Sequence, residues 1–269
     1  MNEELASRIL YCDGNCIVVN KIAGEVVEGA GKGMIDLPRQ IAGSQLNSQF
    51  EPDGRTAVGL LDLPVAVHRL DVPVSGCAVF ARTNKALLFL NAAFRDSTAN
   101  NGASGSLIEK KYWAIAEMPQ KIPEPLAPAA DCAELTHWIQ FDAKKNKSIA
   151  YNEPGSGRKK AVMRCRIIGK GTHYLFLEID LLTGRHHQIR AQLGQLGLHV
   201  KGDLKYGARR SEPEGGIRLH ARSISFPSPT GGPTGNPTDD GKRITVQAVP
   251  PLRDNLWLAF EDAAANTKH

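Results

Sequence analysis

A charged tetrapeptide, His68-Arg69-Leu70-Asp71, constrains this chain more than any other feature. A turn containing Pro73 and Gly76 follows it, and an apolar run at 77–81 comes next. A short apolar run bounded by turn residues is typical of a buried strand, so Asp71 is expected beside the start of one. Charged groups leave water only when they are paired or hydrogen-bonded. Because the proline and glycine also restrict the turn, the pattern predicts that Asp71 is held at a fixed angle.

Composition narrows the class of protein. The 269 residues carry 33 lysines and arginines against 28 acidic residues, a net charge of +5. This mild excess is compatible with a polyanion partner and equally with an ordinary soluble protein. Five widely spaced cysteines without a CxxC pair argue against a disulfide framework and against a zinc site. The chain shows no signal peptide and no apolar run near 18 residues, so we expect a cytoplasmic protein.

Hydrophobic periodicity predicts more strands than helices, and several strands arrive as hairpins. An Asp13-Gly14 turn between β-prone runs marks the first hairpin. The expected fold is therefore α/β of the α+β type, with a mixed, mostly antiparallel sheet flanked by a few helices. Strands are predicted at 9–11, 16–21, 77–81, 110–117, 163–169, 174–182, 219–226 and 244–249, and helices at 37–41, 84–95, 183–196 and 252–264.

Three polar, glycine-rich segments interrupt this pattern. They cover residues 28–62, 97–106 and 228–242 and are predicted to be loops, the last two flexible by composition. Loops as long as the first are unusual in compact domains unless they have a function or are disordered. No internal repeat is present, and we expect a single domain spanning residues 1–269.

A second charged segment, Thr183-Gly184-Arg185-His186-His187-Gln188-Ile189-Arg190, follows a predicted strand. Two arginines and His187 beside a helix N-terminus favour an anion, either a phosphate or the carboxylate of Asp71. A polar helix start with surface arginines is the alternative. A metal site on His186 and His187 is a weak hypothesis, because adjacent helical residues point about 100° apart and no third ligand lies at a supporting spacing.

These segments resemble motifs of the RluA-type RNA pseudouridine synthases, in the order that the family has them. The second charged segment matches the TGRxHQIR motif at every fixed position. Two positions depart from the family pattern: Val74 replaces a threonine and Ile22 a proline, and neither change removes a catalytic group. The other matching segments are His68–Gly76 (HRLDxxTSG), Lys110–Tyr112 (KxY), Gly202–Gly207 (GDxxYG), Leu219–Ala221 (LHA) and Val18–Gly24 (VNKPxG).

The resemblance implies a pseudouridine synthase fold without an S4 module, and isomerisation of uridine to pseudouridine within RNA. The reaction needs no cofactor and no metal. By analogy Asp71 is the catalytic carboxylate, Arg185 the cation paired with it, and Tyr112 the platform on which the flipped base stacks. Covalent attack at C1′ and proton abstraction at C2′ both remain open.

The resemblance also assigns substrate contacts. Arg69 is expected to help displace the base, and residues 28–62 to contact and select the substrate. The further candidates for contact with RNA are His68, Lys21, His187, Arg190, Lys110, Lys201 and Lys205. We expect a monomer acting on structured tRNA or rRNA, without a membrane or an obligate protein partner.

Two alternatives come from other classes of protein. The first is a catalytically silent RNA-binding protein of the same fold. The second is a metal-dependent hydrolase or deaminase that uses His186, His187 and Asp203.

Overall fold

The computed structural model describes residues 3–29, 35–43, 60–99, 107–126, 132–229 and 242–267. Much of the predicted loop at 28–62, and most of those at 97–106 and 228–242, lies outside these ranges. Residues 97–99 are an exception to the loop prediction, because they end helix α4 (Asn84–Ala99). In the described part of the chain, no helix has the length and apolar character needed to cross a bilayer.

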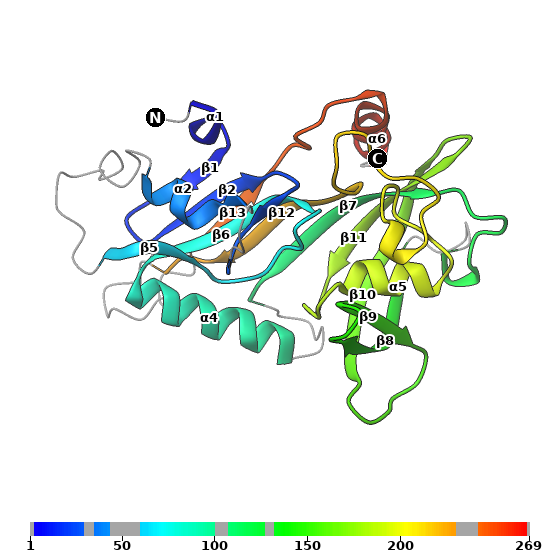
Figure 1. Cartoon of the computed structure of the whole chain (residues 1–269), viewed down its shortest axis with the longest axis horizontal. Helices are drawn as coiled ribbons and strands as arrows, with labels where there is room; N and C mark the ends of the chain where they lie inside the picture. Colours follow the sequence, from blue (N-terminus) through cyan, green and yellow to red (C-terminus); the bar gives the residue numbers. More distant parts are fainter. Residues whose placement is uncertain are drawn as a thin grey trace.

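One large sheet organises the described residues (Figure 1). Its eleven strands follow the order β1-β2-β6-β12-β7-β11-β10-β8-β9, with β13 paired to β12 and β5 paired to β6. Strands β6 and β12 run parallel, and the other neighbours are antiparallel, which confirms the predicted sheet. The strands are β1 (Ile9–Cys12), β2 (Cys16–Lys21), β5 (Leu60–Ala66), β6 (Ser75–Thr83), β7 (Glu109–Glu117), β8 (Ala133–Asp142), β9 (Lys147–Tyr151), β10 (Lys159–Lys170), β11 (Tyr174–Leu181), β12 (Leu219–Pro227) and β13 (Arg243–Gln247).

A few short elements and helices flank this sheet. Figure 1 shows α4 along β5 and β6, α5 beside β8 and β9, and α6 near β7 and β11. The helices are α1 (Glu3–Ala6), α2 (Leu37–Gly43), α4, α5 (Gln188–Gln195) and α6 (Asn255–Asn266), with 3-10 turns η1 (Glu124–Leu126) and η2 (Leu204–Tyr206). A small parallel pair, β3 (Glu25–Val26) and β4 (Ile35–Asp36), lies apart from the large sheet.

Strand β6 anchors the site because it is buried on both faces. All nine of its residues are buried, which explains the continuous apolar run in the sequence. Cys77 and Val79 pack in the cluster that α4 covers, while Ala78 and Phe80 pack in the main core. The segment that carries Asp71 therefore enters a strand that cannot shift without disturbing both cores.

The structure corrects two predictions of secondary structure. Helix α5 begins at Gln188 rather than at 183 or 184, because the Gln188 side chain folds back onto the preceding turn, where it accepts hydrogen bonds from Thr183 Oγ1 (2.7 Å) and Arg185 N (2.9 Å). His187, at the N-cap, has a left-handed backbone (φ 51°). The sequence analysis also assigned no strands to residues 133–151, which form the β8–β9 hairpin.

Replacing Gly76 by alanine should destabilise the fold. Its φ of +116° is unfavourable for any side chain, and a Cβ there would lie 2.6 Å from the backbone nitrogen of Ala221 on β12. Backbone strain and overpacking together predict a loss of about 2–5 kcal/mol in the free energy of unfolding, measured by urea denaturation.

The matched control is Gly14→Ala, because a Cβ at Gly14 meets nothing within 4 Å and its backbone φ is not positive. We expect that variant to stay within about 1 kcal/mol of the wild type. Equal stability of the two variants would contradict the proposed steric role of Gly76.

Candidate active site

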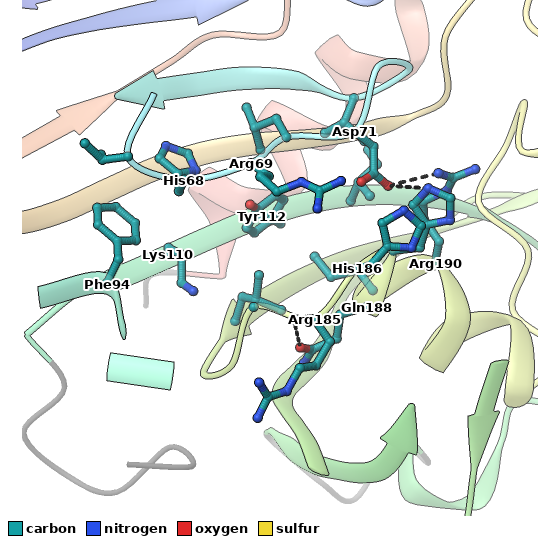
Figure 2. A pocket seen from close by; sticks show the side chains of 18 of the residues that line it. His68, Arg69, Asp71, Phe94, Lys110, Tyr112, Arg185, His186, Gln188 and Arg190 are labelled. Atoms are coloured by element: carbon teal, nitrogen blue, oxygen red, sulfur yellow. Dashed lines mark hydrogen bonds and ion pairs between the residues drawn. The ribbon is translucent and has the colours of Figure 1, made fainter. Parts of the chain in front are cut away.

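A cavity of about 360 Å³ opens where the starts of β6 and β7 meet the turn before α5. Figure 2 shows it running from the His68 and Phe94 rings at one end to Asp71 and Arg190 at the other. Eight of the eleven candidate site residues line it, and Lys21, Lys201 and Lys205 do not. The eight are His68, Arg69, Asp71, Lys110, Tyr112, Arg185, His187 and Arg190.

Asp71 is paired with Arg190, not with Arg185. The distance from Arg190 Nη1 to Asp71 Oδ2 is 2.9 Å, and His187 Nε2 lies 3.7 Å from the same oxygen. The predicted Asp71–Arg185 pair is wrong because Arg185 sits in the turn before α5, where its Nε donates to the Lys160 carbonyl at 3.0 Å. Oδ1 of Asp71 has no hydrogen-bond partner among the described residues.

Arg190 is itself fixed by a second carboxylate. Its Nε and Nη2 donate to the two oxygens of Asp203 at 2.7 and 2.9 Å, a bidentate fork in which both residues are buried. Burial alone would lower the pKa of Arg190, but Asp203 and then Asp71 raise that pKa above its usual value. The Arg190 side chain is 5% exposed and its donors face carboxylates, so its observed role is to hold Asp71, and its contact with RNA stays a prediction.

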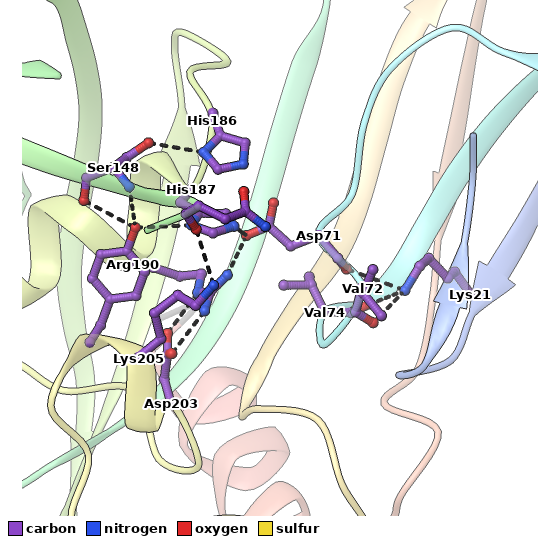
Figure 3. A network of polar contacts seen from close by, with 12 residues as sticks. Lys21, Asp71, Val72, Val74, Ser148, His186, His187, Arg190, Asp203 and Lys205 are labelled. Carbon is purple, nitrogen blue, oxygen red and sulfur yellow. Dashed lines mark hydrogen bonds and ion pairs between the residues drawn. The ribbon is translucent and has the colours of Figure 1, made fainter. Parts of the chain in front are cut away.

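His187 stands beside Asp71 as a neutral ring. Burial, and then the positive charge of Arg190, lower the pKa of His187 to about 3. Its Nδ1 lies 2.9 Å from Tyr206 Oη, which also accepts the backbone N–H of Ser148 at 2.9 Å (Figure 3). The tautomer with the proton on Nε2 points a donor, rather than a lone pair, toward the Asp71 carboxylate.

Lys21 holds the Asp71 loop from behind. Its side chain is fully buried, and the ammonium donates to the carbonyls of Val74 (2.7 Å), Val72 (3.0 Å) and Ile22 (3.0 Å), with the Asp71 carbonyl at 3.3 Å (Figure 3). Burial lowers the pKa of Lys21 to about 8. The predicted contact of Lys21 with RNA is wrong, because the residue acts inside the protein as a clamp on four carbonyls.

The other end of the cavity is aromatic and basic. His68 Nε2 accepts the N–H of Val79 at 3.1 Å, and its ring stacks on Phe94 with 5.1 Å between centroids. Burial lowers the pKa of His68 to about 3 and that of Lys110 to about 8. Between the two ends, exposed Arg69 extends its guanidinium across the cavity next to Tyr112 (Figure 2).

Two lysines proposed to contact RNA lie outside the cavity. Lys205 is exposed and donates to the Asn146 carbonyl at 3.0 Å. Lys201 is paired with Glu212.

Sequence reasoning missed several residues that build the site. Asp203 and Tyr206 belong to a quoted motif, yet their roles as the partners of Arg190 and His187 appear only in the fold. Ser148 gave no signal at all. The metal hypothesis for His186, His187 and Asp203 does not fit this arrangement, because both Asp203 oxygens are engaged by Arg190.

Comparison with known proteins identifies the family. A family model described as RNA pseudouridylate synthase matches residues 15–195. The RNA pseudouridine synthase 4, mitochondrial, of Arabidopsis thaliana is 32% identical over 76% of this chain, which spans 41% of that protein. An uncharacterised RNA pseudouridine synthase of Zymomonas mobilis is 29% identical over 82% of this chain and 88% of its own length.

The fold gives the same result. The solved structure of Human RNA Pseudouridylate Synthase Domain Containing 4 is similar with a TM-score of 0.65, 19% identity, and coverage of 98% of this chain and 95% of that one. At this identity the likeness concerns the fold alone, whereas the family model covers most of the sequence. The chain therefore belongs to the RNA pseudouridylate synthase family.

Proposed function

We propose that this chain isomerises uridines in structured tRNA or rRNA to pseudouridine, as a monomer, with Asp71 as the catalytic carboxylate. The observation that carries the proposal is the state of Asp71. One of its oxygens is held by Arg190, and the other has no hydrogen-bond partner among the described residues that line the cavity. A ribosomal large subunit pseudouridine synthase C of Vibrio cholerae, 27% identical over 84% of this chain, supports rRNA as one candidate substrate.

The reaction rearranges bonds within one nucleotide. The N1–C1′ bond breaks, the uracil turns, C5 bonds to C1′, the hydrogen on C5 leaves as a proton, and N1 takes up a proton, so that no atom is gained or lost overall. A carboxylate near C1′ can attack that carbon or remove the proton at C2′, and the free oxygen of Asp71 fits either role. In both routes Asp71 acts as the carboxylate, and Arg190 orients it through the 2.9 Å bond to Oδ2.

Other cavity residues supply binding and access. The uridine must leave the RNA stack, which costs a few kcal/mol. Arg69 extends into the cavity in a position to replace the displaced base, and Tyr112 lines the cavity as a surface for the uracil ring. Base–aromatic stacking contributes about 1–3 kcal/mol toward the cost of flipping.

A silent RNA-binding protein is less consistent with the site. A site that only binds RNA needs cations for the phosphates. A partly exposed carboxylate at the end of the cavity would repel those phosphates. Because a buried ion pair is expensive to maintain, a site that keeps Asp71 between Arg190 and His187 is better explained by chemistry that uses the carboxylate.

Asp71→Asn should abolish isomerisation, since the amide can neither attack C1′ nor accept a proton. We expect a rate at least about 10⁴-fold below wild type. Pseudouridine mapping of total RNA from cells lacking the protein, complemented by wild type or by Asp71→Asn, checks this and identifies the RNA. Restoration of the missing sites by the variant would refute the role of Asp71.

Arg190→Lys should slow the chemical step by about 10²-fold, because a lysine keeps the charge but cannot bridge Asp71 and Asp203. Arg185→Ala should change it by less than about tenfold, since Arg185 bonds a backbone carbonyl instead. Tritium release from C5-labelled uridine in RNA, followed in single turnovers, measures the step. Equal losses in both variants would contradict the pairing described above, provided that melting curves show both to be folded.

The acid side of the rate profile should show no ordinary histidine titration. His68 and His187 have pKa values lowered to about 3, so both are neutral near pH 6, and burial also lowers the pKa of His186. We expect a flat rate between about pH 5.5 and 7.

Stability needs a parallel measurement in this experiment. Below about pH 6.5 the unfolded chain takes up protons that the buried histidines refuse, so the free energy of unfolding falls as the pH is lowered. Melting curves at each pH identify the range in which the enzyme stays folded. A change of the reaction rate with pH near pH 6.5, within that range, would show that a histidine of the cavity titrates.

A further inference from the structure

The β8–β9 hairpin exposes an aromatic ring next to the cavity. The Phe141 side chain is 49% exposed although its strand neighbours His137 and Ile139, on the same face, are buried. Its ring meets that of His186 edge-on, with 4.4 Å between centroids. His186 lines the cavity, so Phe141 extends the cavity wall outward onto the surface.

The hairpin turn, β9 and the start of β10 together carry an excess of positive charge. Residues 142–160 contain five lysines and one arginine against Asp142 and Glu153. Asp142 caps the turn by accepting the N–H groups of Lys144 and Lys145. In the described ranges, none of these five lysines forms an ion pair, and Lys205 forms none either. Arginines elsewhere, such as Arg8, Arg164 and Arg218, do form ion pairs.

Direct contacts join this charged surface to the catalytic network. Ser148 Oγ lies 3.0 Å from His186 Nδ1, and the Lys147 ammonium lies 4.8 Å from the Tyr206 ring centre. Arg185, on the cavity rim, donates to the carbonyl of exposed Lys160. A chain leaving the cavity past His186 would therefore meet Phe141 first and the lysines next.

We propose that this surface, formed by Phe141, Lys144, Lys145, Lys147, Lys160 and Lys205, binds the single-stranded RNA next to the target uridine, with one base stacked on Phe141. The inference rests on the proposed RNA-modifying function. Flipping a uridine leaves its neighbours without their stacking partner, and an exposed ring can replace that partner whatever the base. The lysines attract the phosphates that follow, and their freedom from ion pairs leaves them available to do so.

The test measures binding of a fluorescein-labelled oligouridylate about 12 nucleotides long, within the span of a small binding domain. The full chain carrying Asp71→Asn is used, so that no chemistry alters the probe. Phe141→Ala should weaken binding about 5- to 150-fold, the equivalent of one stacked base, and Phe141→Trp should restore it. Lys144→Glu with Lys145→Glu should also flatten the dependence of log Kd on log salt by about 0.7 for each lost phosphate contact.

The matched control is Lys121→Glu with Lys170→Glu. These two lysines are also exposed and without an ion pair in the described ranges. Lys121 follows the end of β7 and Lys170 is the last residue of β10, whereas the cavity lies at the start of β7 and Lys160 at the start of β10. We expect this control variant to bind the oligouridylate much more tightly than the variant with Lys144→Glu and Lys145→Glu. Equal losses in the two double variants, unchanged binding by Phe141→Ala, or tighter binding of duplex RNA that ignores Phe141 would each overturn the inference.

Failure here is separable from failure of the proposed function. If the wild type releases tritium but the Phe141 substitution does not change RNA binding, the catalytic proposal stands and the proposed binding surface is refuted. If binding depends on Phe141 but no pseudouridine forms, the proposed binding surface stands and the catalytic proposal is refuted. Melting curves establish that every variant compared is folded, which is expected because the substituted side chains are exposed.

Discussion

One guanidinium group shared by two carboxylates is the interaction on which this site depends. Arg190 gives Nε and Nη2 to Asp203, which leaves Nη1 for a single oxygen of Asp71. The three groups together carry one excess negative charge. Asp203 is buried with both oxygens bonded to Arg190, whereas Asp71 is the partly exposed member of the cluster and has one oxygen bonded to Arg190. The arrangement yields a carboxylate that is oriented but not fully neutralised, as chemistry at a sugar carbon requires.

The sheet topology explains how residues so far apart in sequence converge on one carboxylate. The parallel contact of β6 with β12 sets the start of β6 beside β12, and β12 in turn pairs with β7, which carries Tyr112. Lys21, at the end of β2, then fixes the Asp71 loop by donating to the carbonyls of Val72 and Val74. The position of Asp71 is thus set from two sides, by backbone contacts behind it and by Arg190 in front.

Sequence patterns predicted much of the sheet because strand burial is local information. The apolar run of β6 and the first hairpin are examples. Pairing between charges that are distant in sequence is not local information, because it depends here on the backbone of the single turn that precedes α5. The family resemblance assigned Arg185 to Asp71 and the sequence predicted a helix start near 183. The helix in fact begins after His187, whose backbone is left-handed, and Arg190 on the helix bonds the carboxylate. Lys21 was misread for a similar reason, because a strand-end lysine is usually solvated and only the fold supplies four carbonyls to bury it.

The site divides into a rigid part and an exposed part that meet at a few atoms. Arg190, Asp203 and Lys21 are satisfied within the protein, so a change among them leaves a buried group without its partner. The hairpin lysines have no ion-pair partners among the described residues. The hairpin contacts the charge network through Ser148, which bonds both His186 and Tyr206. Substitutions on the exposed hairpin surface can therefore alter RNA contacts while the charge network keeps its geometry. In this architecture, choice of substrate and chemistry at C1′ are physically separate properties, joined at the ring of His186.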